Sequence, residues 1–184
     1  MNATPASLLT AAQRRSRVEL IRRQIELMRR YSAETGDAQH ARWLLKEVIY
    51  RVWEQPQIPP PRFDKYSLWF AWSPRTLERL ASYAQGGKRP DIKGLRLEHV
   101  IPRGILADEL LARERDDLAS FLDAFFKAAV ITVEDDAQLN QAGVRARMPE
   151  GWELGSNPWV RYEHAGLNPA SFEIPCRLRP ELAL

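Results

Sequence analysis

Apolar residues recur with a helical period near the start of the chain. Between residues 8 and 31, apolar side chains return at spacings of three and four, which predicts an amphipathic helix. The residues of this apolar stripe are Val18, Ile21, Ile25 and Met28, widened by Leu20, Leu27 and Tyr31. At about 100° per residue, arginines gather on the opposite arc. These arginines are Arg15, Arg22, Arg23, Arg29 and Arg30.

Two more helices are predicted before residue 90. Asp37 is a typical N-cap, and the segment that follows it to about residue 54 has one apolar side. The side chains expected on that buried side are Trp43, Leu44, Val48 and Trp53. Residues 55–61 contain four prolines, so no helix crosses them. Ser73 and Pro74 then predict a helix start by N-cap and first-turn proline, and the helix runs to about residue 83.

The second half of the chain combines strand and helix patterns. Strands are predicted over residues 95–101 and 128–133, with a helix or a helical pair over 107–129 between them. Thr132 is placed to cap a last helix over 134–143. We therefore expect a mostly helical α+β protein. Residues 1–88 form a basic helical region, and residues 89–184 form a β-hairpin followed by a helix, with a long helical insertion in the hairpin loop and a proline-rich tail.

Charge divides the chain into two unequal parts. The net charge is +3, but residues 1–90 carry 16 Lys and Arg against 8 Asp and Glu, whereas residues 91–184 carry 11 against 16. A basic arm next to an acidic part favours a nucleic-acid partner and a bound cation. Uneven scatter of surface charge, with the arginine arc simply solvated, is the alternative. The lone Cys176 excludes an internal disulfide and a cysteine-based zinc cluster, and a reducing cytoplasm without membrane insertion is expected.

The most specific chemical pattern joins Glu98-His99, at the end of the first predicted strand, with Asp136 and Asn140 on the last predicted helix. Histidine is the usual general base near neutral pH, which assigns that role to His99. Carboxylate and amide oxygens suit Mg²⁺, which makes Glu98, Asp136 and Asn140 candidate metal ligands. Because neighbouring side chains on a strand point to opposite faces, a bend at the strand end is needed to bring Glu98 and His99 to one centre.

These segments resemble the HNH, or His-Me finger, nuclease superfamily. Glu98-His99-Val100-Ile101-Pro102 is similar to its first strand with the catalytic histidine, and residues 131–140 are similar to its second strand and ligand-bearing helix. The resemblance covers roughly residues 93–152. It implies a metal-dependent DNA endonuclease with His99 as general base and Glu98, Asp136 and Asn140 around Mg²⁺.

One departure from that family supports a second hypothesis. Phe126-Lys127-Ala128 occupies the place where the family usually has an asparagine that orients the catalytic histidine. A non-catalytic protein that keeps the finger as a scaffold for binding nucleic acid or a protein partner is therefore the alternative. In a third hypothesis His99 is a core residue and the arginine helix mediates oligomerisation.

Overall fold

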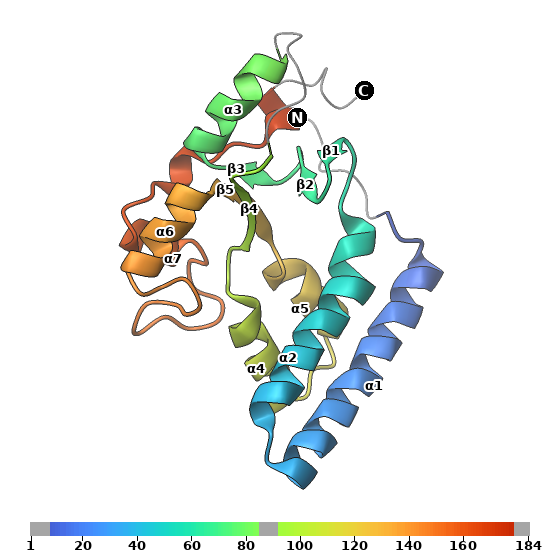
Figure 1. Cartoon of the computed structure of the whole chain (residues 1–184). Coiled ribbons are helices and arrows are strands. Elements are labelled where there is room, and N and C mark those ends of the chain that lie inside the picture. The colour runs from blue at the N-terminus through green and yellow to red at the C-terminus, as the bar shows by residue number, and fades with distance from the viewer. Residues whose placement is uncertain (1–7, 85–91, 179–184) are drawn as a thin grey trace. The chain divides into compact units, whose positions relative to one another are not determined.

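The computed structural model describes residues 8–84 and 92–178, whose contacts group into two compact units. The helical unit comprises residues 8–58 and 103–127, and the sheet unit comprises the described parts of 59–102 and 128–178 (Figure 1). About 57% of the structure is helical, which confirms a mostly helical α+β class. The expected boundary between residues 88 and 89 lies outside the described residues.

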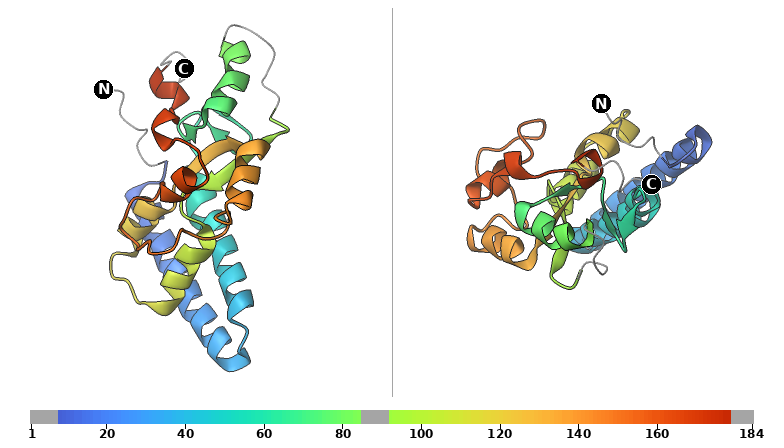
Figure 2. Two further views of the ribbon diagram at one scale, coloured as in Figure 1. Left: turned by 90° about the vertical axis from the view of Figure 1, so that its left-hand side faces the viewer. Right: turned by 90° about the horizontal axis from the view of Figure 1, so that it is seen from above.

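Helices α1 (Ala11–Thr35) and α2 (Ala38–Ile49) form the antiparallel hairpin of the helical unit, side by side in Figures 1 and 2. A capping box starts α1, because the Thr10 hydroxyl accepts from the Gln13 amide while the Gln13 side chain accepts from the Thr10 amide. Gly36, at φ +73°, ends it in the left-handed conformation that glycine adopts without strain. The Asp37 cap of α2 is confirmed by its 2.9 Å bond from the His40 amide.

The remaining elements of the helical unit are short. A π-helical turn η1 (Tyr50–Glu54) and a 3₁₀ turn η2 (Gln55–Gln57) follow α2. The predicted helical segment after the first strand is a pair, α4 (Arg103–Ala112) and α5 (Leu118–Phe125). The buried side chains of the unit come from all four long helices and include Ile21, Ile25, Met28, Ala41, Leu45, Ile49, Leu106, Leu110, Phe121 and Leu122.

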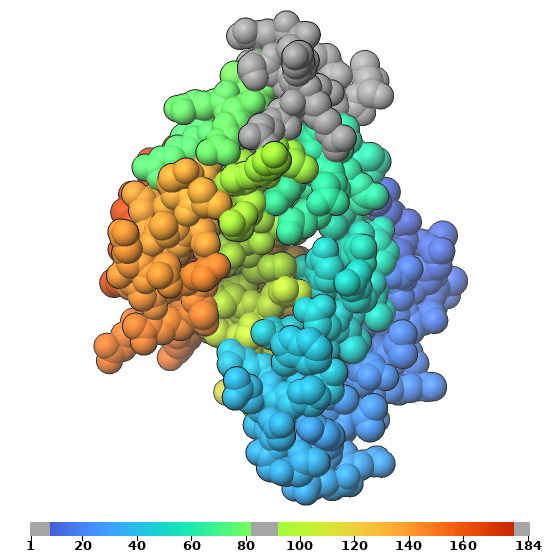
Figure 3. Space-filling model, viewed as in Figure 1, coloured from blue at the N-terminus to red at the C-terminus, as the bar shows by residue number. Residues whose placement is uncertain are grey.

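Three apolar residues predicted on buried faces lie in solvent instead. Leu20 and Leu27 are 44% and 49% exposed, and Trp43 is 51% exposed. On α2 the buried line consists of Ala41, Leu45 and Ile49, so the true core face is rotated from the predicted one. The apolar stripe on α1 is correspondingly narrower, because α2 and its neighbours cover only one side of the helix. Figure 3 shows the blue α1 and the cyan α2 in contact along their length.

The sheet unit contains two small sheets. Strands β1 (Arg62–Phe63) and β2 (Tyr66–Ser67) form a short antiparallel pair. The second sheet has the order β3-β5-β4, built from β3 (Ala71–Trp72), β4 (Leu95–His99) and β5 (Ala128–Thr132). The predicted β4–β5 hairpin is confirmed as antiparallel, whereas the parallel pairing of β3 with β5 was not predicted.

Each face of the three-stranded sheet has its own core, because side chains alternate along a strand. Val130 points to the side that contains Trp72, Leu95 and Cys176, whereas Ala129 and Ile131 point to the opposite side. Helix α3 (Pro74–Ala84) supplies Leu80 to the first core. Helix α6 (Val133–Gln141) and helix α7 (Val160–His164) supply Leu139 and Tyr162 to the second. The tail ends in turn η3 (Pro169–Ser171) and helix α8 (Pro175–Leu178).

Among the described residues, no helix is both long enough and apolar enough to cross a lipid bilayer.

Candidate functional site

The candidate site is built on the β4–β5 hairpin and the helix that follows it. Glu98 and His99 are the last two residues of β4 and pair with Ala129 and Ala128 of β5. Chain direction then reverses at Thr132, and α6 packs back over the hairpin through Leu139. The predicted strand, strand and helix order is thus confirmed, and it puts the acidic residue and the histidine at one end of a strand.

Glu98 and His99 have different surroundings. His99 is buried, with 8% of its surface exposed. The side chain of Glu98 is 21% exposed, and its Oε1 accepts a 2.6 Å hydrogen bond from Nη2 of Arg161 on α7. Glu98 is therefore held as one half of an ion pair, with its remaining surface turned toward solvent.

Arg161 was not predicted as a site residue, yet it contacts the whole strand end. It is completely buried and donates from all three guanidinium nitrogens. Its Nε bonds the Val100 carbonyl at 2.9 Å, and its Nη2 bonds the His99 carbonyl as well as Glu98. Its Nη1 bonds the carbonyls of Val144 and Arg145, just beyond α6, at 3.0 and 2.8 Å. One guanidinium therefore holds the end of β4 and the end of α6 together.

The two predicted ligands on α6 differ in exposure: the Asp136 side chain is 14% exposed, less than that of Glu98, whereas Asn140 is exposed. Asp136 Oδ1 accepts a 2.9 Å bond from Nε of Arg145, and Asn140 is exposed one turn later. Glu98 and Asp136 are consequently linked through two arginines, since Arg161 bonds both Glu98 and the Arg145 carbonyl. Among the described residues, no three His, Cys, Asp or Glu side chains gather as a metal-binding group. Convergence of Glu98, Asp136 and Asn140 on one cation stays a prediction.

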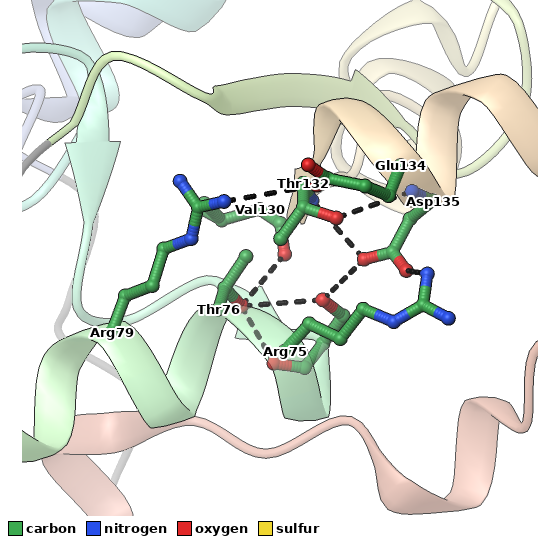
Figure 4. A network of polar contacts seen from close by, with 8 residues as sticks. Arg75, Thr76, Arg79, Val130, Thr132, Glu134 and Asp135 are labelled. Carbon is green, nitrogen blue, oxygen red and sulfur yellow. Dashed lines mark hydrogen bonds and ion pairs between the residues drawn. The ribbon is translucent and has the colours of Figure 1, made fainter.

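Helix α6 starts in a buried polar network, drawn in Figure 4. Asp135, only 1% exposed, accepts from the Thr132 amide at 3.1 Å, while the Thr132 hydroxyl accepts from the Asp135 amide at 3.1 Å. The predicted Thr132 cap is therefore confirmed and is one half of a capping box. Asp135 also accepts from the Ser73 hydroxyl at 2.7 Å and from Arg75 at 3.0 Å. These bonds join the start of α6 to the start of α3.

The surroundings shift the pKa of two ionisable groups in the sheet unit, Glu134 and Tyr162, in ways that favour one charge state of each. The pKa of Glu134 lies below its ordinary value, because its own backbone amide and then the Thr132 hydroxyl donate to the carboxylate. An ionised Glu134 complements the positive end of the α6 dipole. Burial raises the pKa of Tyr162 far above its ordinary value, although the adjacent Arg161 acts in the opposite direction. Tyr162 therefore remains a neutral phenol against the guanidinium.

Replacement of Asp135 by alanine is expected to lower the free energy of unfolding by about 2–4 kcal/mol, since it removes a cap bond and leaves the buried Ser73 hydroxyl without its acceptor. Asp136→Ala is the matched control. The side chain of its ion-pair partner Arg145 is 56% exposed. Loss of this ion pair should therefore lower the free energy of unfolding by only about 0–1 kcal/mol. Urea unfolding of both variants measures the difference, and equal destabilisation would contradict this account of the network.

The five arginines predicted to contact nucleic acid do not share one environment. Arg29 donates to the carbonyls of Leu110 and Leu111 at the end of α4 at 2.8 and 2.9 Å. Arg22 donates to the Arg115 carbonyl at 3.2 Å, so these two cations act inside the helical unit. The other three, Arg15, Arg23 and Arg30, are exposed, and Arg23 pairs with Glu19 one turn earlier.

Comparisons of the chain with protein-family models, with curated proteins and with solved structures give no match.

Proposed function

We propose that the chain is a metal-dependent endonuclease that hydrolyses phosphodiester bonds in DNA, with His99 as general base. The supporting observation is the order of elements around the site: a strand that ends in Glu98-His99, an antiparallel strand, and a helix packed back on the hairpin. This is the order that the resemblance to the HNH superfamily led us to expect.

The chemistry of the donor set fits a hard cation. Glu98 and Asp136 each use one carboxylate oxygen toward an arginine, and Asn140 adds an exposed amide oxygen on the same helix face as Asp136. These three residues would hold Mg²⁺. A bound Mg²⁺ ion supplies neutralisation of the negative charge that builds up on the phosphate and the leaving oxygen.

The chain's own groups would carry out the remaining tasks. His99 would take the proton from the attacking water. Arg161 would fix the backbone at His99 and Val100, because it donates to both carbonyls, and would hold the Glu98 carboxylate in place through a hydrogen bond. The predicted contacts with DNA phosphates involve Arg15, Arg22, Arg23, Arg29 and Arg30, and they stay a prediction. Because Arg22 and Arg29 already donate to backbone carbonyls of the helical unit, these two have fewer N–H groups to donate to phosphates.

A binding protein without catalytic activity is the second candidate. The link from Glu98 through Arg161 and Arg145 to Asp136 favours it, because guanidinium groups already neutralise both carboxylates. In such a protein the hairpin and helix serve as a rigid support for a nucleic-acid or protein partner.

Cleavage of supercoiled plasmid separates the two candidates. The endonuclease should convert it to nicked and linear forms in the presence of Mg²⁺, and excess EDTA should stop the reaction. Zn²⁺ should support less cleavage, since the proposed ligands are oxygen donors. Retention of labelled DNA on the protein without cleavage in any of these cations would establish the binding protein instead.

A further inference from the structure

The two arginines that bond the candidate metal ligands differ in what they can still bind. Arg161 is fully buried, and its three guanidinium nitrogens all donate to the protein. The side chain of Arg145 is 56% exposed, and its Nε donates to Asp136 at 2.9 Å. Its Nη1 and Nη2 have no acceptor among the described residues. Of the two, Arg145 is therefore the one that can contact another molecule.

The backbone of Arg145 is fixed next to the end of β4. Its carbonyl accepts from Nη1 of Arg161 at 2.8 Å, and Nη2 of the same guanidinium bonds Glu98 and the His99 carbonyl. The Arg145 side chain thus starts from a backbone that is joined to the strand end of the candidate site, and Asp136 sets its direction.

The ion pair between Arg145 and Asp136 presents its positive side to solvent. The Asp136 side chain is only 14% exposed, whereas that of Arg145 is 56% exposed. The bond through Nε also leaves the edge formed by Nη1 and Nη2 unused, and this edge can donate two parallel hydrogen bonds to one phosphate group. An exposed guanidinium that is already oriented loses less side-chain entropy on binding than a mobile one does.

We propose that Arg145 binds a phosphate group of the DNA backbone through Nη1 and Nη2, and that Asp136 orients it for this contact. The inference rests on the proposed DNA substrate, and it applies to an endonuclease and to a nucleic-acid-binding protein alike. It adds a phosphate contact in the sheet unit, because the five arginines predicted from the sequence all lie on α1. Asp136 keeps its second carboxylate oxygen for a cation at the proposed site.

The salt dependence of DNA binding tests the contact without any cleavage. Fluorescence anisotropy of a labelled duplex in EDTA gives the affinity at several salt concentrations, and each phosphate contact contributes about 0.9 to the slope of log affinity against log salt. Arg145→Met should flatten the wild-type slope by about 0.9 and weaken binding to unrelated sequences alike. Because Arg145 is largely exposed, the variant should fold.

The matched control is Arg147→Met. It removes another exposed arginine two positions away, whose Nε donates to the Gly143 carbonyl at 2.6 Å rather than to a candidate ligand. This control should keep the wild-type slope. Equal flattening by both variants, or an unchanged slope in Arg145→Met, overturns the proposal.

Replacement of Asp136 by alanine tests the orienting role through the direction of its effect. If Asp136 acted only through its charge, Asp136→Ala would tighten DNA binding, because it removes a carboxylate that repels phosphates. If Asp136 orients Arg145, the variant should instead bind DNA about two- to tenfold more weakly, since a mobile side chain must then be immobilised. Asp136→Ala/Arg145→Met should bind no more weakly than Arg145→Met alone. Tighter binding by Asp136→Ala, or additive losses in the double variant, overturns the orienting role.

Plasmid cleavage with Mg²⁺ separates this inference from the proposed endonuclease. If wild type cleaves while Arg145→Met keeps the full salt slope, the phosphate contact is wrong and the endonuclease stands. If the slope flattens as expected while wild type cleaves nothing, the phosphate contact stands in a binding protein. A wild type that binds no DNA overturns both.

Discussion

An Arg161→Met variant is expected to lose about 3–5 kcal/mol of its free energy of unfolding. The guanidinium is fully buried, and its removal leaves Glu98 without its cation. It also leaves the carbonyls of His99, Val100, Val144 and Arg145 without this donor. Methionine keeps much of the volume and none of the donors, so urea unfolding of the variant reports the polar contacts rather than a cavity.

Two companion variants make that measurement specific. Arg145→Met removes an arginine whose side chain is 56% exposed, and it should cost at most about 1 kcal/mol. The double variant Glu98→Gln/Arg161→Met should recover part of the loss, because glutamine places no unpaired charge beside the buried methionine. If Arg161→Met unfolds at the same urea concentration as wild type, Arg161 does not hold β4 and α6 together.

The strands and the helix that form the site could be predicted from the sequence, because residues close together in the chain determine them. The strands over 95–99 and 128–132, and the helix after Thr132, follow from short apolar runs and a capping residue whose partner lies three positions away. The capping box of Thr132 and Asp135 was also visible in principle, since a threonine followed three residues later by an acidic residue is a known helix start. Sequence reasoning instead singled out Asp136 as the functional carboxylate of this helix. In the structure, Asp135 is the buried carboxylate.

The residues that were missed interact over long distances along the chain. Arg161 bonds Glu98 and Val100 from more than 60 positions away, and Ser73 bonds Asp135 from 62 away. No spacing rule connects such positions, and a single arginine in a tail rich in proline carries no signal of burial. Strand β3 has two residues, too few for an alternating pattern. The parallel pairing of β3 with β5 was therefore beyond sequence reasoning.

Errors on the helix faces have a different cause. Periodicity defines the direction of an apolar stripe but not its edges, which depend on how much of the helix its neighbours cover. Trp43 is adjacent to the buried line of α2 and stacks on the exposed His40 ring rather than entering the core. Leu20 and Leu27 lie beyond the edge of the stripe on α1.

Replacement of His99 by alanine is expected to slow plasmid cleavage by about 10²–10⁴-fold, the usual contribution of a general base. DNA affinity should change little, because the base acts on water rather than on the phosphate backbone. His164→Ala is the matched control, since His164 is an exposed histidine at the end of α7 in the same unit. It should cleave at the wild-type rate.

The buried position of His99 requires a folding check, which separates lost chemistry from lost structure. Urea unfolding and DNA affinity of His99→Ala should be measured on the same preparation as its cleavage rate. A folded variant that binds DNA and no longer cleaves assigns the proton transfer to His99. A folded variant that cleaves as fast as wild type removes His99 from the mechanism, and Glu98, which Arg161 holds at the same strand end, then becomes the base to test.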